Sequence, residues 1–175
     1  MPDKVLSCAI LSYVNEFSDK KADGQAGEVA ALELMTRALV GITLHSLELL
    51  GGEVSLPQFR LLLIASGLGQ VPSSRIAAEA MMPPSSVTRL ADKLEAAGLL
   101  ERGTDPRNRS IVTVKVTEAG LDLVARVVER RHELLAAVLG RMEPDDREAA
   151  ARTARRFAGL AGDAAAFSAT GPLPL

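Results

Sequence analysis

Hydrophobic residues recur at helical spacing along most of this chain, in blocks that polar or glycine-rich stretches separate. This spacing predicts a short helix over 3–18, a long helix over 28–50, another over 118–139 and a last one from Pro144 onward. Residues 19–27 are polar and contain two glycines, so they are predicted to form a linker. The pattern therefore indicates a mainly α-helical chain.

Between the long helix and residue 118 the pattern changes to shorter elements. A helix is predicted to begin at 55–57, where a cap-type serine precedes an early proline, and to run through Ala65. Ser73 or Ser74 is predicted to cap a second helix that reaches about Met81.

A third short helix and a β-hairpin follow. Pro83 and Pro84 should end the preceding helix and start the next, which runs to Ala97 and ends at Gly98. The hairpin comes next, and alternation over 111–116 predicts that its return strand is half-exposed, with the valines on one face. Helix, tight turn, helix and hairpin together are typical of a winged helix-turn-helix. Six apolar positions are spaced to fix the angle between its two helices: Ile76, Ala77, Ala80, Val87, Leu90 and Leu94.

The longer helices carry apolar stripes of their own. The helix over 28–50 is apolar on more than one face, which suits either an intramolecular core or a dimer interface. The helix over 118–139 offers a stripe for burial, and the last helix offers a narrow face of small residues. The predicted buried stripe is Leu121, Val124, Val128, Leu135 and Val138, and the small-residue face is Ala150, Ala154, Phe157, Ala158 and Ala161.

Polar side chains at two places in this middle region point to DNA. Ser85, Ser86, Thr88 and Arg89 open the helix after the turn, where a recognition helix meets base edges. Any three-helix bundle shares such spacing, however, and the two serines would also serve as a simple helix cap. The pattern alone leaves both interpretations open.

The tip of the hairpin carries Asp105, Arg107 and Arg109. Two guanidinium groups on a protruding loop suit the negative potential of a minor groove, and the aspartate can pair with Arg107 and orient it. An ordinary solvated turn is the alternative, because Asp, Pro and Asn are common turn residues.

Composition and charge narrow the class of protein. The chain has 175 residues, of which 47% are hydrophobic and 3% aromatic, and a net charge of −2. Residues 71–117 carry seven basic and five acidic side chains, so the positive charge gathers on the predicted DNA-reading region. A membrane span or a secretory signal is not expected, and a single cysteine fits a reducing cytoplasm.

From about Glu28 to Gly162 the chain resembles MarR-family transcriptional regulators. The segments that carry the resemblance are LPQFRLLLI (56–64), RIAAEAMMPPSSVTRLADKLEAAGLLER (75–102), DPRNRS (105–110) and VKVTEAG (114–120). The resemblance implies a homodimer that binds double-stranded DNA at a near-palindromic site, usually as a repressor. It divides the chain into an extension (1–27), a dimerisation helix (28–54), the winged helix-turn-helix (55–117), C-terminal dimerisation helices (118–162) and a tail (163–175).

The resemblance also assigns roles to residues. Arg107 falls on the arginine of the family's Asp-x-Arg wing motif, which typically enters the minor groove, and Arg75, Arg109 and Lys115 are expected near phosphates. After that arginine the family often has Asp-Arg-Arg, whereas this chain has Asn108-Arg109-Ser110. One charge of each sign is missing there, which puts the stability of the wing in question.

Many such regulators are released from DNA by a small aromatic or lipophilic effector. Arg37, His45 and Arg60 are polar residues within apolar stretches and are the candidates to line its pocket, although a surface arginine or a satisfied interface histidine is the plainer interpretation. Other members sense oxidants through a cysteine near the N-terminus, which makes Cys8 an alternative sensor, although a small buried thiol is the plainer role.

Two functional classes are disfavoured. The chain has no phosphate-binding glycine loop, GxSxG or HExxH motif, so an enzyme is not expected, and neither is a cofactor. His45 and His132 are its only histidines and form no tight cluster with Cys8, so a metal site is not expected either. A winged helix that binds another protein instead of DNA remains the main alternative to the regulator.

Overall fold

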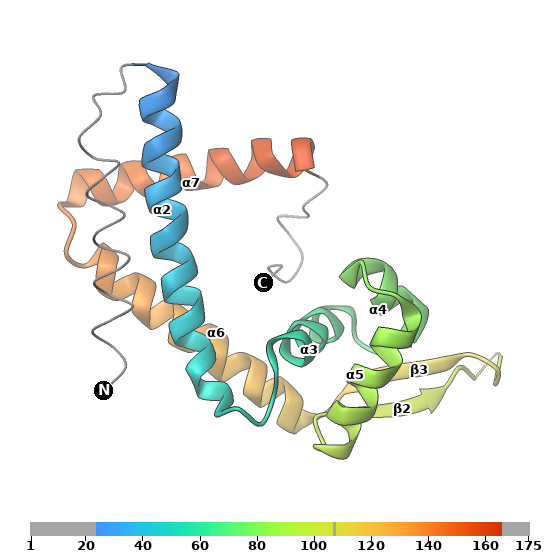
Figure 1. Ribbon diagram of the computed structural model, residues 1–175. Helices are drawn as coiled ribbons and strands as arrows, with labels where there is room; N and C mark the ends of the chain where they lie inside the picture. The colour runs from blue at the N-terminus through green and yellow to red at the C-terminus, as the bar shows by residue number, and fades with distance from the viewer. Residues whose placement is uncertain (1–23, 107, 166–175) are drawn as a thin grey trace. The chain divides into compact units, whose positions relative to one another are not determined.

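A computed structural model describes residues 24–106 and 108–165, with side chains through Ala161 (Figure 1). The chain divides into two units, Met1–His45 and Ser46–Leu175. The predicted helix over 3–18, Cys8, Arg107 and the end of the tail lie outside the described residues.

Helix α2 (Gln25–Ser46) lies in the first unit except for its last residue, Ser46, which begins the second. The prediction of one continuous helix over 28–50 is wrong at its end, because a 3₁₀ turn, η1 (Leu47–Leu50), follows Ser46. Gly51 then closes that turn with a φ of 59°, a conformation that glycine adopts without the steric cost of a side chain. The tighter turn places Leu50 in the core of the second unit.

The second unit is built around helix α3 (Leu56–Leu68). Its middle is apolar on all sides, and five of its consecutive residues, from Leu61 to Ala65, are buried. The backbone N–H of Ser55 donates to Oε1 of Gln58 at 2.9 Å, which satisfies a donor at the start of the helix. The predicted start at 55–57 is therefore confirmed, and the helix extends three residues beyond the predicted Ala65.

Around α3 lie the two helices of the helix-turn-helix, α4 (Ser73–Ala80) and α5 (Pro84–Ala96). The predicted serine cap of α4 is wrong, because Pro72 precedes the helix and Ser73 and Ser74 are already part of it. All six residues predicted to fix the angle between the two helices are buried: Ile76, Ala77, Ala80, Val87, Leu90 and Leu94.

A small antiparallel sheet completes the winged domain, with β1 (Val71–Pro72), β2 (Leu100–Thr104) and β3 (Val112–Val116) in the order β1-β3-β2. The sequence pattern does not predict β1, since two residues give no periodicity and a proline marks a turn as often as a sheet edge. In β3 the expected alternation fails at Val112, which is 46% exposed, and at Thr113, which is buried. Thr113 is held inward because its hydroxyl accepts from Nε2 of Gln70 at 3.1 Å.

Helix α6 (Glu118–Leu139) begins as predicted, and the hydroxyl of Thr117 accepts from the backbone N–H of Gly120. The predicted buried stripe is largely wrong, because Leu121 and Val138 are 46% and 50% exposed and only Val124 of the five is buried. The residues that α6 buries are Gly120, Leu123, Val124, Val127 and Arg131. Helix α7 (Pro144–Ala165) follows, with Asp145 and Asp146 in its first turn.

Candidate nucleic-acid interface

Helix α5 has one buried face and one exposed face. Val87, Leu90 and Leu94 are buried against the rest of the winged domain. Ser85, Thr88 and Arg89 are exposed, and Ser86 is half-buried. Three of the four predicted recognition residues therefore lie on the surface near the start of the helix, where side chains can reach base edges.

The first turn of α5 is set by its prolines. Pro84 is the first helical residue, and the carbonyl of Pro83 accepts from the backbone N–H groups of Ser86 and Val87. The hydroxyl of Thr88 donates to the carbonyl of Pro84 at 3.0 Å, which leaves the lone pairs of its oxygen able to accept hydrogen bonds. The serines are within the helix and do not cap it.

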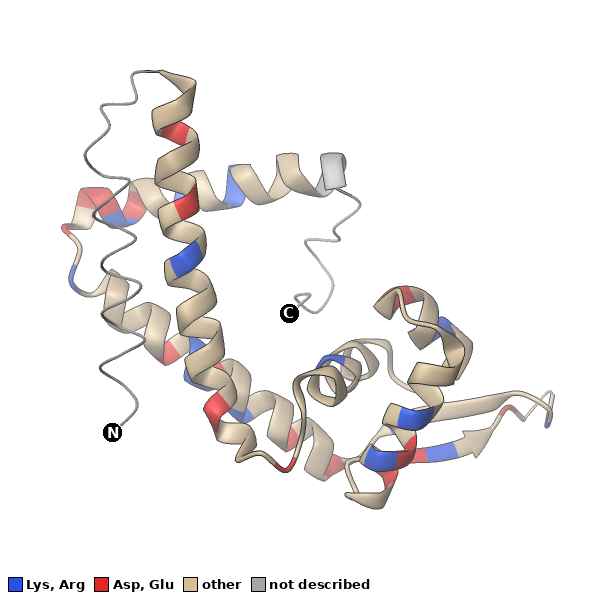
Figure 2. Cartoon of the chain, viewed as in Figure 1, with Lys and Arg blue, Asp and Glu red and all other residues tan. Residues whose placement is uncertain are grey.

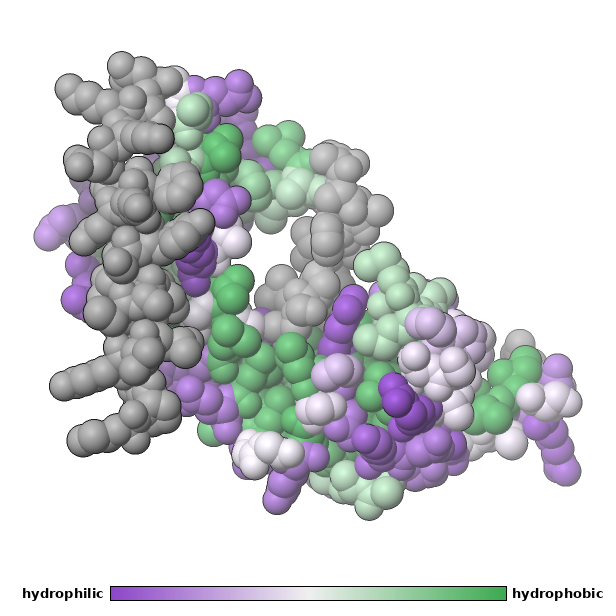
Figure 3. All heavy atoms as spheres, in the orientation of Figure 1, coloured by the Kyte–Doolittle hydropathy of each residue, from purple (hydrophilic) through white to green (hydrophobic). Residues whose placement is uncertain are grey.

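Charged residues of both signs lie along α5 and the neighbouring strand β2 (Figure 2). Arg89 and Lys93 are basic, whereas Asp92 and Glu95 are acidic and are both contacted by Arg102 of β2. Figure 3 shows hydrophilic residues on the surface over α5 and at the tip of the hairpin. The acidic partners of Arg102 explain why the net positive charge of this region is small.

Backbone hydrogen bonds organise the tip of the wing. The backbone N–H of Asp105 donates to the carbonyl of Ile111 at 3.0 Å, and that of Asn108 donates to the carbonyl of Asp105 at 3.2 Å. Oδ1 of Asn108 accepts from the backbone N–H of Ser110 at 3.1 Å. Asparagine therefore supplies a turn-stabilising acceptor at the position where the MarR pattern often has aspartate.

The basic residues predicted near phosphates differ in their surroundings. Arg75 is exposed on α4, with Nη2 3.8 Å from Oε1 of Glu79. Nζ of Lys115 lies 3.0 Å from Oε1 of Glu101, its partner across the β2–β3 pair. Arg109 is exposed at the wing tip.

The three residues suggested for an effector pocket do not fall on one unit. Arg37 is half-buried and His45 is exposed, and both belong to α2. Arg60 belongs to α3, where its Nε is buried without a hydrogen-bond partner. The pocket itself stays a prediction.

Two arginines were not singled out by the sequence pattern. Arg131 of α6 is buried, and its desolvation lowers the pKa of the guanidinium from the ordinary value. Arg102 joins β2 to α5 through residues up to fourteen positions away in the sequence. Contacts over such separations leave no periodic signal in the sequence, so they are found only in the structure.

Residues 24–106 and 108–165 lack two further features. Within these ranges no three His, Cys, Asp or Glu side chains lie together in a way that would hold a metal ion. None of the described helices is both long enough and apolar enough to cross a membrane.

Comparison with known proteins agrees with this geometry. Residues 54–112 match the MarR family model. The chain is 26% identical over 121 residues to the HTH-type transcriptional regulator YfiV of Bacillus subtilis. The aligned region covers 69% of this chain and 74% of YfiV. These matches are to transcriptional regulators and not to enzymes, as the missing catalytic motifs predicted.

Solved structures give the same fold. The structure of RV1404 from Mycobacterium tuberculosis superposes with a TM-score of 0.74 at 28% identity, over 82% of this chain and 98% of that one. FabT of Streptococcus pneumoniae, solved in complex with DNA, matches with a TM-score of 0.60 at 18% identity, over 79% of this chain and 97% of that one. At the latter identity the likeness concerns the fold alone.

Proposed function

We propose that this chain, in which residues 54–112 match the MarR family model, represses transcription by binding a near-palindromic DNA site as a homodimer. In this proposal Ser85, Ser86, Thr88 and Arg89 read the major groove. Arg107, oriented by Asp105, enters the minor groove, and Arg75, Arg109 and Lys115 lie near phosphates. Binding to DNA would place the protein in the cytoplasm.

The observation that carries the proposal is the division of α5 into two faces. Its apolar side chains are buried in the domain, while Ser85, Thr88 and Arg89 near its N-terminus have no role in that core. Short hydroxyl side chains and a guanidinium are the groups that hydrogen-bond base edges and phosphates. An exposed arginine beyond a turn held by Asn108 supports the wing as a second contact.

Exposed apolar side chains support the homodimer. Helix α2 exposes large hydrophobic residues along its length, among them Val29, Met35, Leu39, Val40 and Leu44, at 43–55%. Phe157 and Leu160 of α7 are 51% and 64% exposed. Monomeric proteins rarely leave so much apolar surface in contact with water, and a second copy would cover it. Pairing would then set two recognition helices roughly 34 Å apart, which is about one turn of DNA.

The test is selection of a binding site from a random pool of duplex DNA, followed by affinity measurements over a salt series. We expect an inverted repeat, one dimer per duplex, and an affinity that falls steeply with salt because phosphate contacts release counterions. A folded protein that enriches no sequence, or that binds with no salt dependence, would contradict the proposal. That result would favour the winged helix as a protein-binding module.

We also propose that a small aromatic or lipophilic effector releases the dimer from DNA. The buried, unpartnered Nε of Arg60 on α3 is the observation that favours a polar ligand group beside it, and Arg37 and His45 of α2 are the other two residues proposed for effector binding. Fluorescence polarisation of the selected duplex should fall when aromatic acids or phenols are titrated in. Peroxide should act in the same assay only if Cys8 is the sensor instead.

A further inference from the structure

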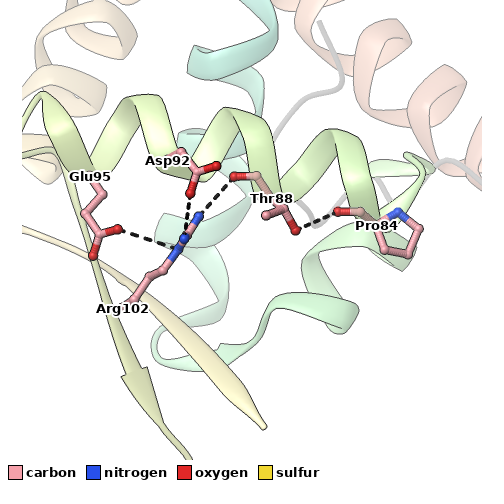
Figure 4. A network of polar contacts seen from close by, with 5 residues as sticks. All are labelled: Pro84, Thr88, Asp92, Glu95 and Arg102. Atoms are coloured by element: carbon pink, nitrogen blue, oxygen red, sulfur yellow. Dashed lines mark hydrogen bonds and ion pairs between the residues drawn. The ribbon is translucent and has the colours of Figure 1, made fainter.

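A single guanidinium group from the wing strand contacts three residues of α5 (Figure 4). Nη1 of Arg102 lies 2.6 Å from Oδ1 of Asp92, and its Nε lies 3.7 Å from Oε2 of Glu95. Nη2 donates to the backbone carbonyl of Thr88 at 3.0 Å. All three nitrogens of the guanidinium are therefore directed at the same helix.

This arrangement differs from an ordinary surface ion pair. The side chain of Arg102 is 26% exposed, whereas those of Asp92 and Glu95 are 57% and 44% exposed. Arg102 is therefore the more enclosed partner, held by several contacts at once. A planar group with several fixed donors loses less freedom for each bond it makes than a flexible pair does. The contacts consequently restrain where α5 lies along β2.

The same contacts affect the charge of the proposed reading surface. Asp92 and Glu95 are exposed carboxylates on the recognition helix, and DNA phosphates would repel them. Arg102 places one positive charge against both, so it offsets part of that repulsion. It also contacts Thr88, which is one of the residues proposed to read bases.

We propose that Arg102 is a positioning residue for DNA recognition, which acts through Asp92 and the backbone of Thr88 and does not touch the DNA. It fixes the recognition helix relative to the wing, so that both meet their grooves in register, and it shields the two carboxylates. This inference rests on the proposed DNA binding, because without a DNA ligand there is nothing for Arg102 to position.

The first experiment compares variants on the duplex that the wild-type protein selects. Arg102→Ala should weaken binding by about tenfold or more, since it removes several charge-assisted hydrogen bonds. Arg102→Lys keeps the charge but not the planar set of donors. Its affinity for the duplex should lie between those of the wild type and Arg102→Ala. Arg130→Ala is the control for the lost positive charge, because Arg130 lies outside the winged helix-turn-helix, on α6, and pairs with Glu133 at 2.9 Å. It should bind like the wild type.

A double-mutant cycle with Asp92→Asn tests whether Arg102 acts through the helix. The loss caused by Arg102→Ala should be at least about threefold smaller in the Asp92→Asn background, because coupled residues are not additive. An equal loss in both backgrounds overturns the inference. Circular dichroism at the assay temperature confirms that each variant is folded, so that a fall in affinity reflects positioning and not unfolding.

The salt series separates positioning from direct contact. Arg102→Lys and Arg102→Ala should keep the wild-type dependence of affinity on salt, since no phosphate contact is lost. A slope smaller by about one would mean that Arg102 itself binds a phosphate, and would overturn the inference. If the wild-type protein selects no duplex at all, the proposed function fails first. If the wild-type protein selects a duplex and Arg102→Ala binds it with the same affinity, the positioning role is refuted and the proposed function is not.

Discussion

The hydroxyl of Thr117 donates to the carbonyl of Gly98 at 2.7 Å and accepts from the backbone N–H of Gly120 at 3.2 Å. Gly98 follows the C-terminal end of the recognition helix, and Thr117 precedes α6. One side chain therefore joins the end of α5 to the start of α6. The backbone N–H of Thr117 adds a second link, to the carbonyl of Leu99 at 3.2 Å.

Thr117→Val should lower the free energy of unfolding by about 1–2 kcal/mol, because the helix loses its N-cap acceptor and Gly98 loses a donor. Thr117→Ser keeps the hydroxyl and should lose much less. Urea unfolding at a fixed protein concentration measures both, and equal stability of the Val and Ser variants would show that the hydroxyl contributes nothing.

Gly120 lies where α6 comes close to Leu99 and to Val116 of β3. A Cβ placed on it would lie 2.2 Å from the carbonyl oxygen of Leu99 and 2.6 Å from Cγ1 of Val116. Backbone atoms cannot move aside cheaply, so Gly120→Ala should destabilise the fold by about 2–4 kcal/mol. Gly159→Ala is the matched control, since nothing lies within 4 Å of its Cβ, and it should be neutral or slightly stabilising. A thermal midpoint of Gly120→Ala at or above that of wild type would contradict this packing.

Gly120 also shows what a sequence pattern misses. The stripe predicted for α6 ran through Leu121 and Val138, but the helix is turned so that Gly120 and Val127 face the core. A prediction from apolar residues does not treat glycine as a buried contact. The prediction therefore favoured the face of α6 that carries Leu121. The rotation is set by the close approach to Leu99, which is a tertiary constraint.

The helix-turn-helix was predictable because its information is local. The buried positions of α4 and α5 recur within about twenty residues, and the prolines before α5 mark its start. Once that core is known, the exposure of Thr88 and Arg89 follows from the helical period. The bonds of Arg102 and the pairing of β1 with β3 depend instead on distant segments, so no spacing rule gave them.

Met81 is the turn residue between α4 and α5 and has a φ of 52°, which is unfavourable for a residue with a side chain. Its side chain is 77% exposed, so little packing is lost when it is removed. Met81→Gly should therefore stabilise the domain by about 0.5–1 kcal/mol. Met81→Val, with a branched side chain at the same φ, should destabilise it. Urea midpoints in the reverse order would contradict the strained turn.

Arg89 and Lys93 test where along α5 the DNA is read. Both are exposed and basic, and they lie four residues apart, so they share a face and differ by about 6 Å along the helix. Because recognition helices use their N-terminal residues, Arg89→Ala should weaken binding to the selected duplex about 10- to 100-fold, whereas Lys93→Ala should cost much less. A larger loss for Lys93→Ala would reverse the proposed orientation of the helix.

Asn108 tests whether an ordered wing matters for binding. Its Oδ1 accepts from the N–H of Ser110, so Asn108→Ala removes a bond that shapes the tip without touching the core. We expect wild-type thermal stability but weaker DNA binding, by about threefold to tenfold, because a turn that has lost this bond must be ordered on binding, at a cost in free energy. Asn108→Asp restores an acceptor and should recover the turn, although its added charge opposes the phosphates. Equal affinity of Asn108→Ala and the wild type, with minor-groove footprints unchanged, would show that the wing reaches its groove without this bond.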